Sequence, residues 1–188
     1  MLIDRRLFLG APLAFWAARA GARQPNWLLV PGETEVKFTY KLNGAPVTGR
    51  MQALSADLEI DLNQLSHSSV EVVLDAANAD PGMPFAKTAM LGSEVLDVAH
   101  NPTIRFVSTK VSGAPSAADV AGQLTLRGTT RPVTFAGRVN TAAGSSDTSH
   151  LVITLNGGIS RAKFGSTGYA DLVGDEVDFT VRARLQRV

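Results

Sequence analysis

Apolar and polar side chains alternate along much of the chain after residue 34. In the first run, Val36, Phe38, Tyr40 and Leu42 alternate with charged and hydroxyl side chains. A period of two is typical of a strand with one face on a core and the other in water. The same pattern predicts further strands over residues 56–62, 70–74, 104–111, 120–126, 132–139, 151–159 and 177–185.

These eight strands are separated by turn signals, of which Asn43-Gly44 is the clearest. Strands with one wet face favour antiparallel pairing, and eight of them are enough to close a barrel or to build a sandwich. One short helix is expected over Pro84–Leu91, because proline is tolerated in the first turn of a helix. The sequence predicts a single all-β domain.

The stretch GQLTLRGTTRPVTF, residues 122–135, is a predicted hairpin with one apolar side. Leu124 and Leu126 share a face, as do Val133 and Phe135, and a polar turn lies between the two pairs. A barrel of eight strands can be filled by its own side chains or can hold one small ligand. Periodicity alone leaves a filled and a hollow barrel both open.

The first 22 residues form an export signal rather than part of the fold. Arg5 and Arg6 precede an apolar run, residues 7–18, and small residues then offer cleavage sites. The run is much shorter than the roughly 20 residues of a membrane span. Arg5-Arg6-Leu7-Phe8-Leu9 resembles the twin-arginine signal. We therefore expect an exported domain over residues 23–188.

Charge and composition exclude several kinds of partner. Eighteen basic and seventeen acidic residues give a net charge of +1, and no basic stretch is long enough to follow a nucleic-acid backbone. The absence of cysteine excludes disulfides and thiolate metal sites. His67, His100 and His150 are far apart in the sequence, so we expect no metal site and no cofactor.

Several segments resemble the YceI-like family. The hairpin of residues 122–135 and ISRAKFG, residues 159–165, are similar to family segments, as is VLDVAHNPTIRF, residues 95–106. The opening stretch 27–38 and the closing stretch 173–185 match in the same order. The resemblance implies an extended, lipocalin-like antiparallel barrel in the bacterial periplasm. Its interior would hold a long apolar ligand, a polyisoprenoid lipid or an isoprenoid quinone.

Under this resemblance the inward faces of the strands become the walls of a lipid tunnel. Arg161 matches the arginine of the family segment and could bind a head-group oxygen, or it could pair with Asp171, Asp175 or Glu176. The candidate ligand-binding residues are Phe38, Tyr40, Leu58, Ile60, Phe106, Leu124, Leu126, Phe135, Ile153, Leu155, Arg161, Phe164 and Phe179.

The expected function is non-enzymatic binding, storage or transport of the lipid, with at most transient contact with a membrane or a membrane cytochrome. The first alternative is a filled barrel that serves as an accessory module of a membrane electron-transfer system. The second is a hydrolase, because Ser160 and Lys163 satisfy a Ser-x-x-Lys pattern. That pattern belongs at the start of a helix, whereas Ser160 follows an extended run.

Overall fold

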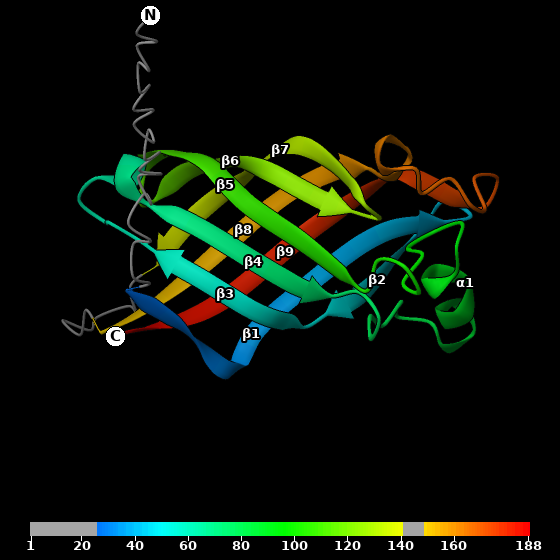
Figure 1. The fold of residues 1–188 in the computed structure, drawn as a ribbon, viewed down its shortest axis with the longest axis horizontal. Coiled ribbons are helices and arrows are strands. Elements are labelled where there is room, and N and C mark those ends of the chain that lie inside the picture. The colour runs from blue at the N-terminus through cyan, green and yellow to red at the C-terminus, as the bar shows by residue number, and fades with distance from the viewer. Residues whose placement is uncertain (1–25, 141–148) are drawn as a thin grey trace, which may run out of the picture.

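The structure, a computed structural model, describes residues 26–140 and 149–188, and the predicted export signal lies outside them. The described residues form nine strands in one sheet (Figure 1). These are β1 (Trp27–Leu42), β2 (Ala45–Met51), β3 (Ala53–Glu59), β4 (Ser69–Asp75), β5 (Thr103–Ala114), β6 (Ala117–Leu126), β7 (Thr129–Asn140), β8 (His150–Ser160) and β9 (Val173–Arg187).

The sheet closes on itself into an antiparallel barrel. Each strand from β3 to β8 pairs with the next, and β9 pairs with β1 from Trp27↔Arg187 to Leu42↔Val173. Only Gln52 separates β2 from β3, so these two short strands together form one interrupted strand of the wall. Counted in this way the barrel has eight antiparallel strands, and the predicted fold class is confirmed.

The sequence pattern missed β2. Its residues Ala45–Met51 pair with β1 in regular register, from Leu42↔Ala45 to Val36↔Met51. Val47, Gly49 and Met51 face inward and alternate with exposed Thr48 and Arg50, but Gly49 has no side chain and Pro46 is disfavoured in strands, so the apolar signal is short. Backbone pairing with β1 therefore makes this segment a strand, whereas its own side chains carry little strand signal.

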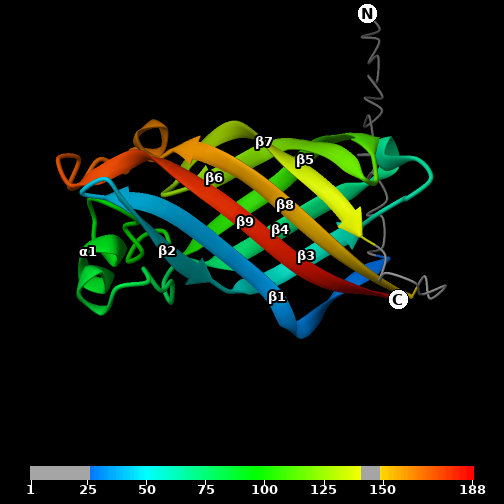
Figure 2. The same cartoon turned by 180° about the vertical axis from the view of Figure 1, so that it is seen from behind.

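Short helices lie at both ends of the barrel. The predicted helix over Pro84–Leu91 is confirmed as η2 (Pro84–Ala86) followed by α1 (Lys87–Leu91). The structure adds η1 (Leu65–His67) and η3 (Arg161–Phe164). Figures 1 and 2 show α1, the β1–β2 turn and the β8–β9 loop at one end of the barrel, which we call the α1 end. No helix among the described residues is both long and apolar enough to cross a bilayer.

The opposite end, which carries η1 and the C-terminus, is closed by a plug of apolar side chains. The plug consists of the buried residues Trp27, Leu58, Ile60, Leu151, Ala183 and Leu185. Trp27 is fully buried, and its Nε1 donates a hydrogen bond of 3.3 Å to the carbonyl oxygen of Ile60. The Arg187 guanidinium covers the Trp27 ring at 5.3 Å from its centroid. Apolar side chains thus fill the η1 end of the barrel.

Candidate ligand-binding cavity

Two apolar cavities lie inside the barrel, one after the other along its axis. The outer cavity, at the α1 end, has a volume of about 240 Å³, and the inner cavity, toward the plug, has about 140 Å³. Ile104 and Phe179 line both, so the two cavities meet at these side chains. An apolar cavity of about 150 Å³ can stay dry and admit a molecule as large as benzene. The barrel is therefore hollow, which periodicity had left open.

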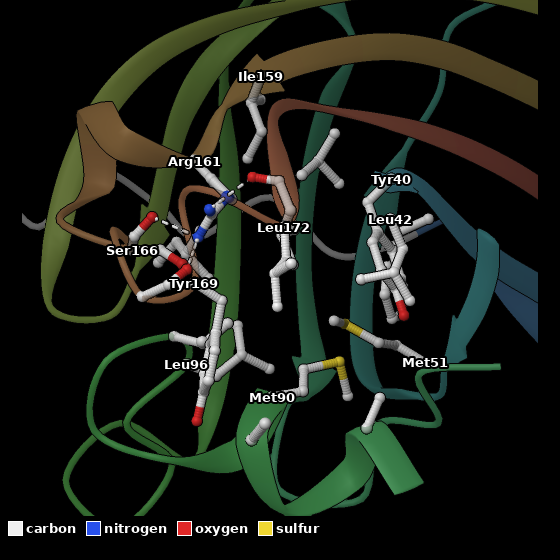
Figure 3. Close-up of a pocket in the computed structure, with 18 of the residues that line it drawn as sticks. Tyr40, Leu42, Met51, Met90, Leu96, Ile159, Arg161, Ser166, Tyr169 and Leu172 are labelled. Atoms are coloured by element: carbon white, nitrogen blue, oxygen red, sulfur yellow. Dashed lines mark hydrogen bonds between the residues drawn. The ribbon is translucent and has the colours of Figure 1, made fainter. Parts of the chain in front are cut away.

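The outer cavity is bounded by strands on one side and by loops and α1 on the other. Its strand residues are Phe38, Tyr40, Leu42, Met51, Ile104, Leu126, Ile159, Val173, Val177 and Phe179. In Figure 3, Tyr40 and Leu42 stand across the cavity from Arg161, while Met51 and Met90 approach it from below. Methionine adapts its shape easily, so this wall can fit an irregular chain.

The rim of the outer cavity exposes large apolar side chains to solvent. Phe85 of η2 lines the cavity and is 77% exposed. Tyr169 and Leu172 of the β8–β9 loop also line the cavity, and each is 49% exposed. Exposed apolar side chains are ordinary one at a time, but a group at a cavity mouth marks an interaction site. The rim is thus the apolar entrance of the outer cavity.

The inner cavity is lined almost entirely by inward-facing strand residues. Its walls are Leu29, Thr34, Val36, Ala53, Leu58, Ile60, Val70, Val72, Leu74, Ile104, Phe106, Leu124, Phe135, Ile153, Leu155, Phe179, Val181, Ala183 and Leu185. The rings of Phe106, Phe135 and Phe179 meet edge to face, with centroids 5.4 Å and 6.4 Å apart. Among these walls, only Thr34 carries a polar side-chain atom, so the inner cavity suits a hydrocarbon.

Glycines on neighbouring strands keep these phenylalanine rings against the wall. A Cβ added to Gly122 would lie 2.6 Å from the Phe106 ring, and one added to Gly157 would lie 2.6 Å from the Phe135 ring. A Cβ added to Gly49 would likewise lie 2.2 Å from the Phe38 ring. Because glycine has no side chain, each ring can lie over the backbone of the next strand instead of projecting into the interior. The three glycines therefore help to keep the barrel hollow.

Replacing Gly157 with alanine is expected to push the Phe135 ring into the inner cavity. The closest atoms to the new Cβ belong to this ring, which has free space beside it, so the ring moves rather than the backbone. We expect a loss of stability of about 1–3 kcal/mol from overpacking and weaker binding of apolar probes. Gly158→Ala is the matched control, because its Cβ would meet the exposed Asp178 side chain. Isothermal titration with an apolar probe measures the difference, and equal binding by both variants would contradict the role of Gly157.

Arg161 is buried in the wall of the outer cavity, with 6% of its surface exposed. Its Nε donates to the carbonyl oxygen of Gly174 at 3.0 Å, and its Nη2 donates to that of Val173 at 2.9 Å. Its Nη1 donates to the carbonyl oxygens of Ser166 and Gly168 at 2.9 Å and 2.8 Å. A guanidinium has five N–H donors, so four backbone bonds leave one. Arg161 therefore holds the β8–β9 loop at the cavity wall.

The predicted ion pair of Arg161 is wrong. Among the described residues no carboxylate forms a salt bridge with Arg161, and carbonyl oxygens take that place because the loop wraps around the side chain. Burial lowers the pKa of the guanidinium, and the nearby Asp175 opposes this shift. The Asp175 carboxylate instead accepts a hydrogen bond of 2.8 Å from the backbone N–H of Ala162. Asp175 has a lowered pKa, first because of a hydrogen bond from Ser160 and then because of the one from Ala162.

A family model described as the YceI-like domain matches residues 27–185, most of the chain. The chain belongs to the YceI-like family. Among its relatives, a UPF0312 protein of Vibrio vulnificus (strain YJ016) is 33% identical over 91 residues, 48% of each chain. This YceI-like chain therefore matches about half the length of that relative. A UPF0312 protein of Vibrio parahaemolyticus is 28% identical over 137 residues, 71% of this chain and 72% of that protein.

Solved structures share the YceI-like fold. The crystal structure of Burkholderia cenocepacia BcnA has a TM-score of 0.75 at 21% identity and covers 84% of this chain and 99% of its own. A polyisoprenoid binding domain from Saccharophagus degradans, implicated in plant cell wall breakdown, has a TM-score of 0.65 at 12% identity. It covers 88% of this chain and all of its own. At these identities the likeness establishes the architecture of the barrel.

The YceI-like barrel brings nearly all the predicted site residues to the two cavities. Phe38, Tyr40, Leu126 and Arg161 line the outer one, and Phe179 lines both. The inner one receives Leu58, Ile60, Phe106, Leu124, Phe135, Ile153 and Leu155. Phe164, the last residue of η3, is the exception, because it is buried in the core and lines neither cavity.

Sequence reasoning missed the walls that do not come from alternating strands. Phe85, Met90, Leu96, Tyr169 and Leu172 belong to η2, α1 or loops, where no period identifies an inward face. The matched motif ISRAKFG was the one usable signal for the β8–β9 loop, because its arginine organises that loop.

The Ser-x-x-Lys pattern of this YceI-like chain lacks the expected helical setting. Ser160 ends β8, and the following turn η3 is a four-residue 3-10 helix rather than an α-helix that starts at the serine. The Ser160 hydroxyl hydrogen-bonds Asp175, and Lys163 is exposed. Within residues 26–140 and 149–188, no group of three histidine, aspartate or glutamate side chains could hold a metal ion.

Proposed function

We propose that this protein is a non-enzymatic carrier or store for a long apolar isoprenoid lipid or isoprenoid quinone. The observation that carries the proposal is the pair of adjoining apolar cavities along the barrel axis. A related fold, the Saccharophagus degradans domain, is described as polyisoprenoid binding, which favours the same ligand class for this protein. A filled accessory module would have no comparable interior.

The driving force is the removal of the hydrocarbon chain from water. Burial of apolar surface contributes about 25 cal/mol per Å². A branched chain that occupies both cavities would contact side chains such as Leu126 and Phe179 on all sides, with little need for polar recognition. Binding of this kind depends on cavity shape and length rather than on a catalytic group.

The polar atoms of the cavities favour a head group at the α1 end. Arg161 and Tyr169 lie on the outer cavity, whereas the inner cavity is apolar apart from Thr34. The Tyr40 hydroxyl donates a hydrogen bond of 3.0 Å to the carbonyl oxygen of Pro81, and burial raises its pKa. The fifth N–H and the charge of Arg161 favour a quinone or phosphate oxygen at this level. The tail then extends toward the plug.

The proposed site of action is the bacterial periplasm, reached by the twin-arginine route. The support is the sequence pattern of residues 1–22, which is typical of an export signal, and the cysteine-free composition. Phe85, Tyr169 and Leu172 would form the transient contact with a membrane, because they surround the entrance through which a lipid enters. Transfer of the lipid then needs no full exposure of its chain to water.

Native mass spectrometry of the mature protein, purified without detergent, tests the proposed function. We expect one molecule of a prenyl lipid or quinone per chain, which organic solvent extracts and tandem mass spectrometry identifies. A protein that is bare and also takes up no prenyl lipid during incubation would contradict the proposal. Turnover of an ester that Ser160→Ala removes would instead support the hydrolase alternative.

A further inference from the structure

The barrel wall has a seam between β1 and β3. β1 pairs with β3 at one position, Trp27↔Leu58, whereas β3 pairs with β4 along its length. The pairing of β1 with β9 is also interrupted, between Leu29 and Thr34. Figures 1 and 2 show this part of β1 bending away from the barrel. We define the seam as the region between residues 28–34 of β1 and residues 53–57 of β3.

The bend is built into the sequence. Pro31 has no N–H to donate to a neighbouring strand, and Gly32 has a φ of +76°, a conformation that favours glycine. The β1–β3 ladder that begins at Trp27↔Leu58 does not continue to these two residues. The seam is therefore a fixed feature of the wall.

The inner cavity reaches this seam from inside. Leu29 and Thr34 on β1 and Ala53 on β3 all line it, so residues on both sides of the seam belong to the cavity wall. The Thr34 hydroxyl is buried there and has no hydrogen-bond partner. The residue that lines the cavity on the β3 side, Ala53, has only a methyl group as side chain.

Large apolar side chains border the same seam on the outside. Leu28 on β1 is 52% exposed, and Leu54 on β3 is 57% exposed. A strand facing water normally carries polar side chains at such positions. Ala53 thus lines the cavity, and its neighbour Leu54 presents an apolar surface to the exterior at the same place in the wall.

The plug blocks a straight path out of the inner cavity. Trp27, Leu151 and Leu185 are each at most 1% exposed and close the η1 end. Leu29 lies two residues after Trp27, so the seam is beside the plug, at the end of the inner cavity. A chain that fills both cavities and continues meets the plug and has the seam beside it.

We propose that the seam is a side portal through which the distal units of a long isoprenoid chain leave the inner cavity. Outside, these units lie on Leu28 and Leu54, which shield part of them from water. The barrel thereby holds chains longer than its two cavities. This inference rests on the proposed function, because it concerns the tail of the same ligand.

Photo-crosslinking with prenyl phenols of graded length, each carrying a diazirine at the distal end, tests the portal. We expect a probe that fills only the outer cavity to label residues inside the barrel. A probe of eight or more isoprene units is roughly as long as the barrel, whose length is set by its strands. The diazirine of this probe should label Leu28 or Leu54, and peptide mass spectrometry locates the labelled residue. Retention of every probe with labelling only inside the barrel would overturn the portal and leave the proposed function intact. Failure to retain any probe would overturn both.

Closing the seam gives an independent test. Ala53→Trp places a large side chain on the inner side of the seam, and Gln123→Trp, the control, places one on the exposed outer face of β6, away from the seam. We expect Ala53→Trp to weaken binding of the long probe at least about tenfold and of the short probe less than about twofold. Gln123→Trp should bind both probes as the parent does, because Gln123 lines neither cavity and lies outside the seam. An equal loss for both lengths in Ala53→Trp would overturn the portal, and the crosslinking result decides if that variant does not fold.

Discussion

Replacing Ala89 with tryptophan is expected to abolish retention of an isoprenoid ligand while the barrel still folds. Ala89 lies on α1 and lines the outer cavity, so an indole at this position occupies the space that the ligand uses. Excluding about 120 Å² of ligand surface costs about 3 kcal/mol, which is roughly a 100-fold loss of affinity. Titration of a prenyl probe, followed by tryptophan or probe fluorescence, measures this change.

Thr88→Trp is the matched control for Ala89→Trp. Thr88 precedes Ala89 on the same short helix but is exposed and does not line the cavity. We expect its affinity to stay within about twofold of the parent and its melting temperature to stay close to it, because exposed substitutions rarely change stability by more than about 0.5 kcal/mol. Undiminished binding by a folded Ala89→Trp variant would show that the ligand does not occupy the outer cavity.

Arg161→Met is expected to destabilise the barrel more than a change in the cavity walls such as Gly157→Ala. It leaves the carbonyl oxygens of Ser166, Gly168, Val173 and Gly174 without their donor. Hydrogen bonds to a charged group are the strong ones, and losing a buried network of this kind costs about 3–5 kcal/mol. For a chain of this size we expect the melting temperature to fall by about 10 °C. Thermal unfolding monitored by circular dichroism measures the shift.

Two further variants separate structural from ligand-binding roles of Arg161. Arg138 is exposed and donates one hydrogen bond of 3.1 Å to the carbonyl oxygen of Ser116, so Arg138→Met should change stability by about 0.5 kcal/mol or less. Arg161→Lys keeps the charge but cannot reach four carbonyls, so it should recover only part of the stability. A stable Arg161→Met variant that loses preference for lipids with polar head groups would instead make Arg161 a head-group ligand.

The strand pattern was predictable because burial acts on every second residue of a half-exposed strand. Phe38, Leu124 and Phe135 were identified as inward-facing from alternation alone, and each lines a cavity. Phe164 was assigned to the cavity wall through its motif, but it ends η3 and packs in the core outside both cavities. A residue in a turn has no period that ties burial to one face of a sheet.

The tertiary structure decided which inward-facing side chains border open cavity space. Gly157 and Phe135 are far apart in the sequence, and only the pairing of β7 with β8 shows that one makes room for the other. The partners of Arg161 are backbone carbonyls, which no sequence pattern identifies. The same holds for Phe85 and Tyr169, which belong to separate segments and meet at one cavity.

The sequence by itself determined the all-β class, the inward faces and the short helix at Pro84, because these follow from local periodicity and turn chemistry. The break in β1 pairing at Pro31 and Gly32, by contrast, was identified only in the folded structure. Whether the barrel is hollow depends on how side chains from distant strands share the interior volume. That sharing is set by register and closure, so only the folded barrel decided it.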